Sequence, residues 1–363
     1  MKRLRFPILV IFLISYMFVL TSCSDKSGDI AILSDSDVFQ ASSLNNKIDI
    51  LWMIDSSGSM QEEQDNLATN FNAFINDFVT KGYDYNIAVG ATDAWRYEFN
   101  PASTTFQNLV KFRDGNIYTG STADNSGVFM ISTLTPDIIP TFNKNVKVGI
   151  TGNGDERAFE SIRQSLLAPM NSGFNFRRSD AYLAIIIVSD EEDFSRDDST
   201  LDPCTATPLP ATCQDLRPIS EYTGFLDSYT SSTPADRKYG VSAIGVFDSA
   251  CLTEAGASDH MGERYAELAV ETNGVTGSIC DDDFSPTLDA IQAHISEEST
   301  QFRLSRIPVV SSIVVRINSV LIPQDATNGW TYVAASNSIK FHGTAIPAQG
   351  ASIQVLFDPT TLN

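Results

Sequence analysis

The sequence predicts an α/β fold with a mostly parallel sheet flanked by helices, followed by a small all-β module. Strand and helix patterns alternate from about residue 47, which is typical of βαβ units. Two apolar runs, 48–54 (IDILWMI) and 182–188 (YLAIIIV), are nearly continuous, as expected of strands buried on both faces. Beyond about residue 305 no helical pattern remains.

The elements of the α/β domain follow in chain order. Strand patterns cover 48–54, 85–91, 182–188 and 241–247. Helical patterns cover 61–80, 155–169, about 261–272 and about 286–297. The stretches near 93–147 and 191–220 are long for connections, so we interpret them as insertions, the first partly β. The domain is therefore predicted to span 45–305.

Short strand patterns then fill residues 306–363, which we interpret as a small β-domain. They cover 311–322, 329–333, 338–341 and 351–357. Asn328-Gly329 is a hairpin-turn signal, and Ile353, Val355 and Phe357 alternate strictly. These strands either form a module of their own or extend the edge of the first sheet.

The amino-acid composition argues against some classes of function. The chain has 363 residues, 24 Lys+Arg, 45 Asp+Glu and a formal net charge of −21. A nucleic-acid partner is excluded, because phosphate contacts need a basic face and none is evident. With 3 His in the chain, a multi-histidine zinc enzyme is disfavoured. An acidic chain of this kind is suited to cations or neutral partners.

The N-terminus has the features of a targeting segment. Lys2, Arg3 and Arg5 precede an apolar run at 8–20, which is too short to span a bilayer and typical of a signal peptide. The following LTSC at 20–23 resembles a bacterial lipoprotein signal. The resemblance implies that residues 1–22 are a signal peptide cleaved before Cys23, and that Cys23 carries the lipid.

Residues 23–44 are rich in Ser and Asp, and we interpret them as a tether. Ser24 after Cys23 resembles lipoproteins sent to the outer membrane. We therefore expect a lipid-anchored protein of the cell envelope, in the outer membrane of a Gram-negative bacterium.

Four cysteines remain besides Cys23, namely Cys204, Cys213, Cys251 and Cys280. In an exported protein they predict two disulfides, and none has the C-x₂-C spacing of a zinc site. Three connectivities are possible. The sequence-local choice is Cys204–Cys213 with Cys251–Cys280.

Oxygen-bearing side chains follow two of the predicted strands. Asp55, Ser57 and Ser59 stand at alternate positions in DSSGS after the first strand, and Asp190 follows the strand at 182–188. Ligands of open α/β sheets bind beyond the carboxyl ends of strands, and hard oxygen donors suit Mg²⁺. The alternative is that DSSGS only caps a helix, with Ser59 and Glu62 as a capping box.

These motifs together resemble a von Willebrand factor type A (VWA) domain over about residues 45–300. The matching segments are DSSGS at 55–59, TGNGDERAFESI at 151–162, VSD at 188–190 and NGVTGSICDDDFSPTLDAI at 273–291. The resemblance implies a Rossmann-like VWA domain with a metal-ion-dependent adhesion site. It implies Mg²⁺, or Mn²⁺ or Ca²⁺, bound by Asp55, Ser57, Ser59 and Asp190.

One ligand position of that family stays open here. The family's threonine precedes the next helix, where this chain offers Thr151 or Asp155. Asp155 would add negative charge and weaken the pull of the ion on an external carboxylate. Glu191, Glu192 and Asp193 extend the acidic rim and are expected to form a solvated loop, and Trp95 is a weaker candidate for an exposed aromatic.

The function expected from these observations is binding. The resemblance implies a membrane-anchored adhesion lipoprotein whose ion recognises an acidic side chain of a protein or other macromolecular partner. The alternative is a structural or assembly lipoprotein of the envelope whose metal only stabilises the fold. The chain has no G-x-S-x-G or H-E-x-x-H motif and no base beside DSSGS, so we do not expect an enzyme.

Overall fold

The computed structural model describes residues 35–40, 47–116, 118, 123–200, 204, 213–255, 260–348 and 350–360. The predicted signal peptide and the lipidation site Cys23 lie outside these residues. Within the described ranges, no helix is long and apolar enough to cross a membrane.

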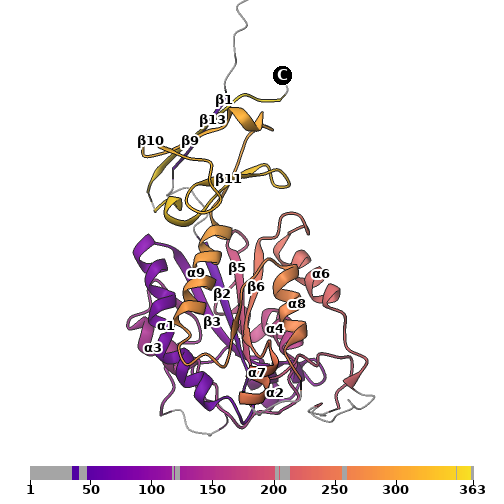
Figure 1. The fold of residues 1–363 in the computed structure, drawn as a ribbon. Coiled ribbons are helices and arrows are strands. Elements are labelled where there is room, and N and C mark those ends of the chain that lie inside the picture. Colours follow the sequence, from indigo (N-terminus) through magenta and orange to yellow (C-terminus); the bar gives the residue numbers. More distant parts are fainter. Residues whose placement is uncertain are drawn as a thin grey trace, which may run out of the picture. The chain divides into compact units, whose positions relative to one another are not determined.

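The predicted α/β fold is confirmed (Figure 1). The largest sheet among the described residues has the strand order β4-β3-β2-β5-β6-β7, in which every pairing except that of β4 with β3 is parallel. Its strands are β2 (Lys47–Ile54), β3 (Asp84–Ala91), β4 (Ile131–Ser132), β5 (Tyr182–Ser189), β6 (Tyr239–Gly245) and β7 (Thr276–Ser278).

Helices cover both faces of this sheet because its central strands are apolar on both. In β2, Ile50 and Trp52 point into the core formed with α1 (Gln61–Lys81), α3 (Ile138–Asn145) and α9 (Ser285–Ser299). Leu51 and Met53 point to the opposite core, as the two-residue period of a strand requires. That second core is formed with α4 (Ala158–Leu167), α6 (Ile219–Thr230) and α8 (Glu263–Glu271).

The predicted insertions also contain regular structure. The first contains a 3₁₀ turn η1 (Thr92–Tyr97), α2 (Thr104–Val110), the short strand β4 and helix α3. The remaining short helices of the domain are α5 (Pro169–Ser172) and α7 (Ser249–Ala255). In the second insertion, residues 201–203 and 205–212 lie outside the described part of the chain.

The C-terminal strands form two antiparallel sheets with a core of their own, so they do not extend the edge of the parallel sheet. One sheet has the order β1-β13-β9-β10, and the other has the order β11-β12-β8. Their strands are β1 (Asp35–Gln40), β8 (Gln301–Arg303), β9 (Val314–Ile317), β10 (Val320–Ile322), β11 (Trp330–Val333), β12 (Ser338–Phe341) and β13 (Ser352–Phe357). The 3₁₀ turns η3 (Val310–Ser312) and η4 (Gly343–Ala345) complete the module.

Three boundaries differ from the sequence interpretation. The module begins with β8 at residue 301, directly after α9, and it recruits β1 from inside the predicted tether. β1 pairs with the edge of β13 that β9 leaves open, which gives that strand a partner on both sides. The predicted strand 311–322 is two strands, β9 and β10, joined by Asn318 and Ser319 at positive φ.

The hairpin predicted at Asn328-Gly329 is wrong. The flanking strands β10 and β11 belong to different sheets, and the two-residue turn is instead the one at Asn318-Ser319. Asn tolerates the left-handed conformation, and the Asn318 side chain also accepts a hydrogen bond from the Ser352 amide. A dipeptide signal cannot tell which of two Asn-containing segments the surrounding sheet will use.

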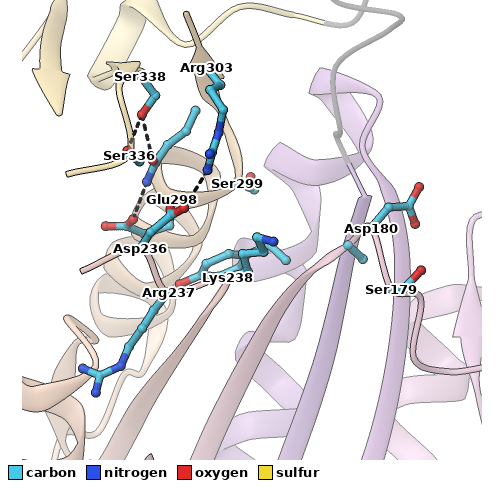
Figure 2. A pocket seen from close by; sticks show the side chains of 13 residues that line it. Ser179, Asp180, Asp236, Arg237, Lys238, Glu298, Ser299, Arg303, Ser336 and Ser338 are labelled. Atoms are coloured by element: carbon cyan, nitrogen blue, oxygen red, sulfur yellow. Dashed lines mark hydrogen bonds and ion pairs between the residues drawn. The ribbon is translucent and has the colours of Figure 1, made fainter. Parts of the chain in front are cut away.

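The module contacts the α/β domain at the amino ends of the parallel strands. Arg303 pairs with Asp236, which precedes β6, at 2.7 Å, and Lys340 pairs with Glu298 of α9 at 2.6 Å. Figure 2 shows this junction, where a cavity of about 220 Å³ lies between Asp180, Lys238 and Ser338. The carboxyl ends of the strands, which carry Asp55, are therefore opposite the module.

Both predicted disulfides are confirmed. Cys204 and Cys213 are bonded with their Cα atoms 5.8 Å apart, and Cys251 and Cys280 with theirs 5.6 Å apart. The second disulfide joins α7 to the segment between β7 and α9.

A buried ion-pair cluster fixes the segment that enters β5. Asp49 of β2 is fully buried and accepts hydrogen bonds from the Arg178 amide at 2.6 Å, Arg178 Nε at 2.8 Å and Arg177 Nη1 at 3.1 Å. Burial raises the pKa of Asp49 to about 6 although both arginines oppose the rise, so the carboxylate is charged at neutral pH.

We predict that Asp49→Ala lowers the free energy of unfolding by about 3–5 kcal/mol, because two half-buried guanidinium groups lose their counter-charge. Asp84→Ala is the matched control. Asp84 also pairs with Arg178 but is 44% exposed, so its loss should cost less than about 1 kcal/mol. Urea denaturation at pH 7 measures both, and equal losses would contradict the prediction.

Candidate metal site

The two central strands bring the candidate ligands together. β2 and β5 pair in parallel with Ile54 opposite Val188, and the Asp55 amide donates to the Val188 carbonyl at 2.9 Å. After β2 the chain continues to β3 on one side, while β5 lies on the other. Asp55 and Asp190 thus stand where the strand order reverses, the place at which open α/β sheets bind ligands.

Asp55 is held rigidly at the end of β2. It is fully buried, its Oδ1 accepts from the Ser57 amide at 2.7 Å, and its Oδ2 accepts from the Ser189 hydroxyl at 2.6 Å. Burial first, and then the charge of Asp190, raise the pKa of Asp55 to about 7. The carboxylate is therefore oriented but poorly compensated.

The two serine hydroxyls of DSSGS converge on the same turn. Ser57 Oγ and Ser59 Oγ lie 3.3 Å apart. Helix α1 begins after Met60, and Met60 makes no side-chain cap. The capping-box alternative for Ser59 and Glu62 therefore finds no support in the described hydrogen bonds, and the hydroxyls are available as ligands.

Asp190 carries an unsatisfied acceptor. The residue is 2% exposed, and its Oδ1 has no hydrogen-bond partner. Burial raises the pKa of Asp190, while the Ser59 hydroxyl opposes the rise. A buried carboxylate oxygen without a partner is costly, and a bound cation would satisfy it.

Two further acids, neither of them among the predicted ligands, belong to this centre. Glu156 is fully buried, and neither of its carboxyl oxygens has a hydrogen-bond partner of ordinary geometry. Burial, followed by the charges of Asp55 and Glu191, raises its pKa well above the ordinary value, against a small opposing effect of the Thr92 hydroxyl. Burial and the charges of Asp55 and Asp190 raise the pKa of Glu191 to about 9.

The centre lacks a positive charge of its own. Among the described residues, no ion pair involves Asp55, Glu156, Asp190 or Glu191, although the chain pairs most of its other buried acids. In the same ranges, no three acid, His or Cys side chains meet closely enough to hold an ion by themselves. Serine hydroxyls must complete any ligand set, which fits a hard divalent cation.

Thr151 and Asp155, the two alternatives for the open ligand position, differ in their surroundings. Thr151 is exposed and lines a neighbouring cavity. Its neighbour Gly152 packs against the DSSGS turn and donates its amide to the Ser56 carbonyl at 2.9 Å. A Cβ on Gly152 would lie 2.3 Å from Ser56 Oγ, so the close approach of the two loops requires glycine.

Asp155 is instead the centre of a buried ion-pair cluster. Its Oδ1 accepts from Arg157 Nε and Arg196 Nη1, and its Oδ2 accepts from Nη2 of both arginines, over 2.9–3.2 Å. All three side chains are fully buried. Two guanidinium groups therefore occupy the lone pairs that an ion would need.

Two weaker expectations are wrong. Trp95 is not an exposed aromatic, because it is 1% exposed and lies 3.7 Å beneath the Arg157 guanidinium. The run Glu191–Asp193 is not a solvated loop. Asp193 accepts from the Phe159 amide at the start of α4 and from Arg264 Nε, and Glu192 accepts from the Arg264 amide at the start of α8.

The sequence indicates that Glu156 and Glu191 lie near the predicted ligands, but it does not indicate that they lack arginine partners. Both stand beside a predicted ligand, Asp155 or Asp190, in an acidic run at a strand or helix end. The sequence offers Arg157 as a partner for one acid of the pair Asp155-Glu156. It does not indicate which one, because that depends on where Arg196 of a distant loop is placed.

No family model and no curated protein matches this chain. Solved structures do match, among them the pilus adhesin SpaC from Lactobacillus rhamnosus GG, at 12% identity and a TM-score of 0.41. That match covers 86% of this chain and 38% of SpaC, so the chain spans well under half of that protein.

Two other matches are also distant. The ArnB paralog VWA2 from Sulfolobus acidocaldarius is 13% identical with a TM-score of 0.32, over 91% of this chain and 68% of that one. Proximal thread matrix protein 1 from the mussel byssus, with a zinc-occupied metal-ion-dependent adhesion site motif, is 10% identical with a TM-score of 0.35, over 73% and 51%. At such values the likenesses transfer no ligand and no partner to this chain.

We predict that Asp155→Ala lowers the free energy of unfolding by about 3–5 kcal/mol without metal, because Arg157 and Arg196 lose their buried counter-charge. Divalent metal should still raise the melting temperature of the variant by the wild-type increment. Asp198→Ala, which removes a 39% exposed partner of the same arginines, is the control and should cost far less. Loss of the metal increment in a folded Asp155→Ala or Asp155→Asn protein would make Asp155 a ligand.

We predict that Glu156→Gln raises the free energy of unfolding when a chelator removes divalent metal. The pKa of Glu156 is higher in the folded protein than in the unfolded chain, so the wild type loses stability as the pH rises above the pKa of the unfolded chain. Gln does not titrate, so the stability of Glu156→Gln relative to the wild type grows with pH. At pH 7 it should reach up to about 3 kcal/mol and shrink to below about 1 kcal/mol at pH 5. Glu267→Gln is the control, since Glu267 is exposed on α8 and forms no ion pair within the described residues, so its neutralisation should change stability by less than about 1 kcal/mol at either pH. Urea denaturation at both pH values decides, and a loss of stability at pH 7 in Glu156→Gln would refute the assignment.

Proposed function

We propose that this chain is a binding module of the bacterial cell envelope that recognises a macromolecular partner through a divalent cation. The proposed ligands are Asp55, Ser57, Ser59 and Asp190, and the proposed ion is Mg²⁺, with Mn²⁺ and Ca²⁺ as alternatives. Bound there, the ion would offer an open coordination position to an acidic side chain of the partner. The single observation that carries the proposal is the buried, unpartnered Asp190 Oδ1 beside Asp55 and two serine hydroxyls.

The arrangement of this chain's own residues supports that role. Asp55 is oriented by two hydrogen bonds, and β2 and β5 fix its position relative to Asp190. Ser59 is exposed while Ser57 and Asp55 are buried, so the site opens to solvent on the Ser59 side. An ion bound by buried side chains on one side and accessible to solvent on the other would be able to contact a partner.

We infer binding and not catalysis from what surrounds the site. Within the described residues, the contacts of Asp55 and Asp190 include no His, Cys or Lys that would act as a base or nucleophile. His294 and His342 lie toward the β module, where they interact with Glu298 and Glu297. Turnover of a substrate by the metal-loaded protein would contradict this inference.

One observation favours the second candidate, a metal that only stabilises the fold. Glu156 and Glu191 place two more carboxyl groups beside the ligands, and full ionisation would give the site more negative charge than one divalent cation neutralises. An ion so compensated attracts an external carboxylate weakly. The two candidates therefore differ in whether metal changes partner binding or stability alone.

The place of the β module bears on how the site would be presented. β1 belongs to the module, and the module contacts the amino ends of the parallel strands through Arg303 and Asp236. An anchor at Cys23, as we propose, would enter the fold through β1. The candidate site lies at the ends of the parallel strands opposite the module that β1 joins.

We predict that Mg²⁺ or Mn²⁺ raises the melting temperature of the wild type, since a ligand that binds the native state stabilises it by mass action. Asp55→Asn should abolish this increment and, in parallel, the metal-dependent capture of envelope proteins. Asp289→Asn removes an exposed charge on α9 and is the matched control, expected to behave like the wild type. An unchanged increment in Asp55→Asn would refute the metal site, whereas capture that ignores metal while the increment persists would favour the stabilising role.

A further inference from the structure

A second cavity opens beside the candidate metal site. It has a volume of about 700 Å³, within the range of sites that enclose small ligands. The loop 151–153 forms one wall, and Asp93 and Tyr118 form another. The Tyr118 hydroxyl donates to Asp93 Oδ2 at 2.7 Å and lies within hydrogen-bonding distance of Ser56 Oγ, at 3.1 Å, which joins this wall to the DSSGS turn.

The lining of this cavity is basic in a strongly acidic chain. Arg96, Lys111 and Arg113 line it, against the acids Asp93 and Asp114, while the whole chain has a net charge of −21. Among the described residues, none of these three cations takes part in an ion pair. Such a concentration of unpaired positive charge is the feature expected where an anion binds.

Arg113 is the most deeply buried of the three. It is 1% exposed, its Nη1 donates to the Asn108 carbonyl at 3.2 Å, and its Nη2 donates to the Leu109 carbonyl at 2.8 Å. Its buried Nε has no hydrogen-bond partner. Asp93 and Asp114 interact with this guanidinium electrostatically, but within the described residues neither forms an ion pair with it, so an anion in the cavity would add compensation for its burial.

The remaining wall combines amides with aromatic rings. Four asparagines line the cavity together with Phe112 and Phe129: Asn108, Asn116, Asn125 and Asn153. The Lys111 ammonium lies 3.6 Å from the centre of the Phe129 ring, which holds that cation at the wall. Amides suit hydroxyl groups, and phenyl rings suit the apolar face of a sugar ring.

We propose that this cavity binds an acidic saccharide of one or two sugar units, with its carboxylate beside Lys111, Arg96 and Arg113. Charge-assisted hydrogen bonds to the carboxylate would supply most of the affinity, and the asparagine amides would contact the hydroxyl groups. The concave shape and the mixed amide and aromatic lining favour a saccharide over an acidic peptide. The site does not depend on the proposed metal, although the loop 151–153 places it next to that ion.

The test titrates digalacturonic acid into the wild-type protein in chelator by calorimetry, with the neutral digalactose as the comparison sugar and a glutamate-rich peptide as the competing class. We expect digalacturonic acid to bind at least about tenfold more tightly than digalactose. Lys111→Gln and Arg96→Gln should each weaken its binding about tenfold or more. Lys147→Gln is the matched control, since Lys147 is a half-exposed lysine outside the cavity and pairs with Asp65.

Three outcomes would overturn the proposal. These are no binding of digalacturonic acid, equal binding of both sugars, or binding that Lys111→Gln and Arg96→Gln leave unchanged. Binding of the peptide in place of the sugar, lost in the same variants, would overturn the assignment to a saccharide. The melting increment with Mg²⁺, measured on the same variants, should remain, so failure here is distinguishable from failure of the metal site.

Discussion

The parallel pairing of β2 with β5 is the constraint on which the rest of the site depends. It joins Asp55 to the Val188 carbonyl and places Asp190 beside it, at the point where the strand order reverses. The strands are buried on both faces, so the carboxylates at their ends are forced into a region of low dielectric. Burial is accordingly the largest cause of the raised pKa of each acid in the centre.

The protein treats its buried acids in two different ways. Asp155, Asp193 and Glu160 are each matched by arginines that come from other segments of the chain. Asp55, Glu156, Asp190 and Glu191 are left without such partners in the described structure. Asp155 and Glu156 are neighbours in sequence and yet fall on opposite sides of this division. This contrast supports the proposed cation site, because the arginines of the neighbouring segments are paired with other acids.

The two ends of the parallel sheet carry different structures. The amino ends carry the junction with the β module, which includes partly exposed ion pairs such as Arg303 with Asp236. The carboxyl ends carry the acidic centre and, across the loop 151–153, the basic cavity. An acidic centre and a cavity lined by three cations thus lie beside each other at this end of the sheet.

The sequence by itself determined the α/β class and the main strands and helices of the first domain, and the spacing of its cysteines favoured the disulfide pairing that the structure contains. Apolar periodicity and cysteine spacing are local patterns. They predict these features well because burial of the apolar face selects the same helix or strand in the folded protein. The sequence also predicted that Asp55, Ser57, Ser59 and Asp190 lie at one edge of the sheet, because parallel strands share their carboxyl ends.

Only the tertiary structure decided which of the neighbouring acids are paired with arginines. Whether Asp155 or Glu156 meets an arginine depends on Arg196, 41 positions after Asp155, and the entry of β1 into the last sheet depends on an open edge of β13 more than 300 residues away. Such pairings are long-range and are settled by packing, which no local pattern records.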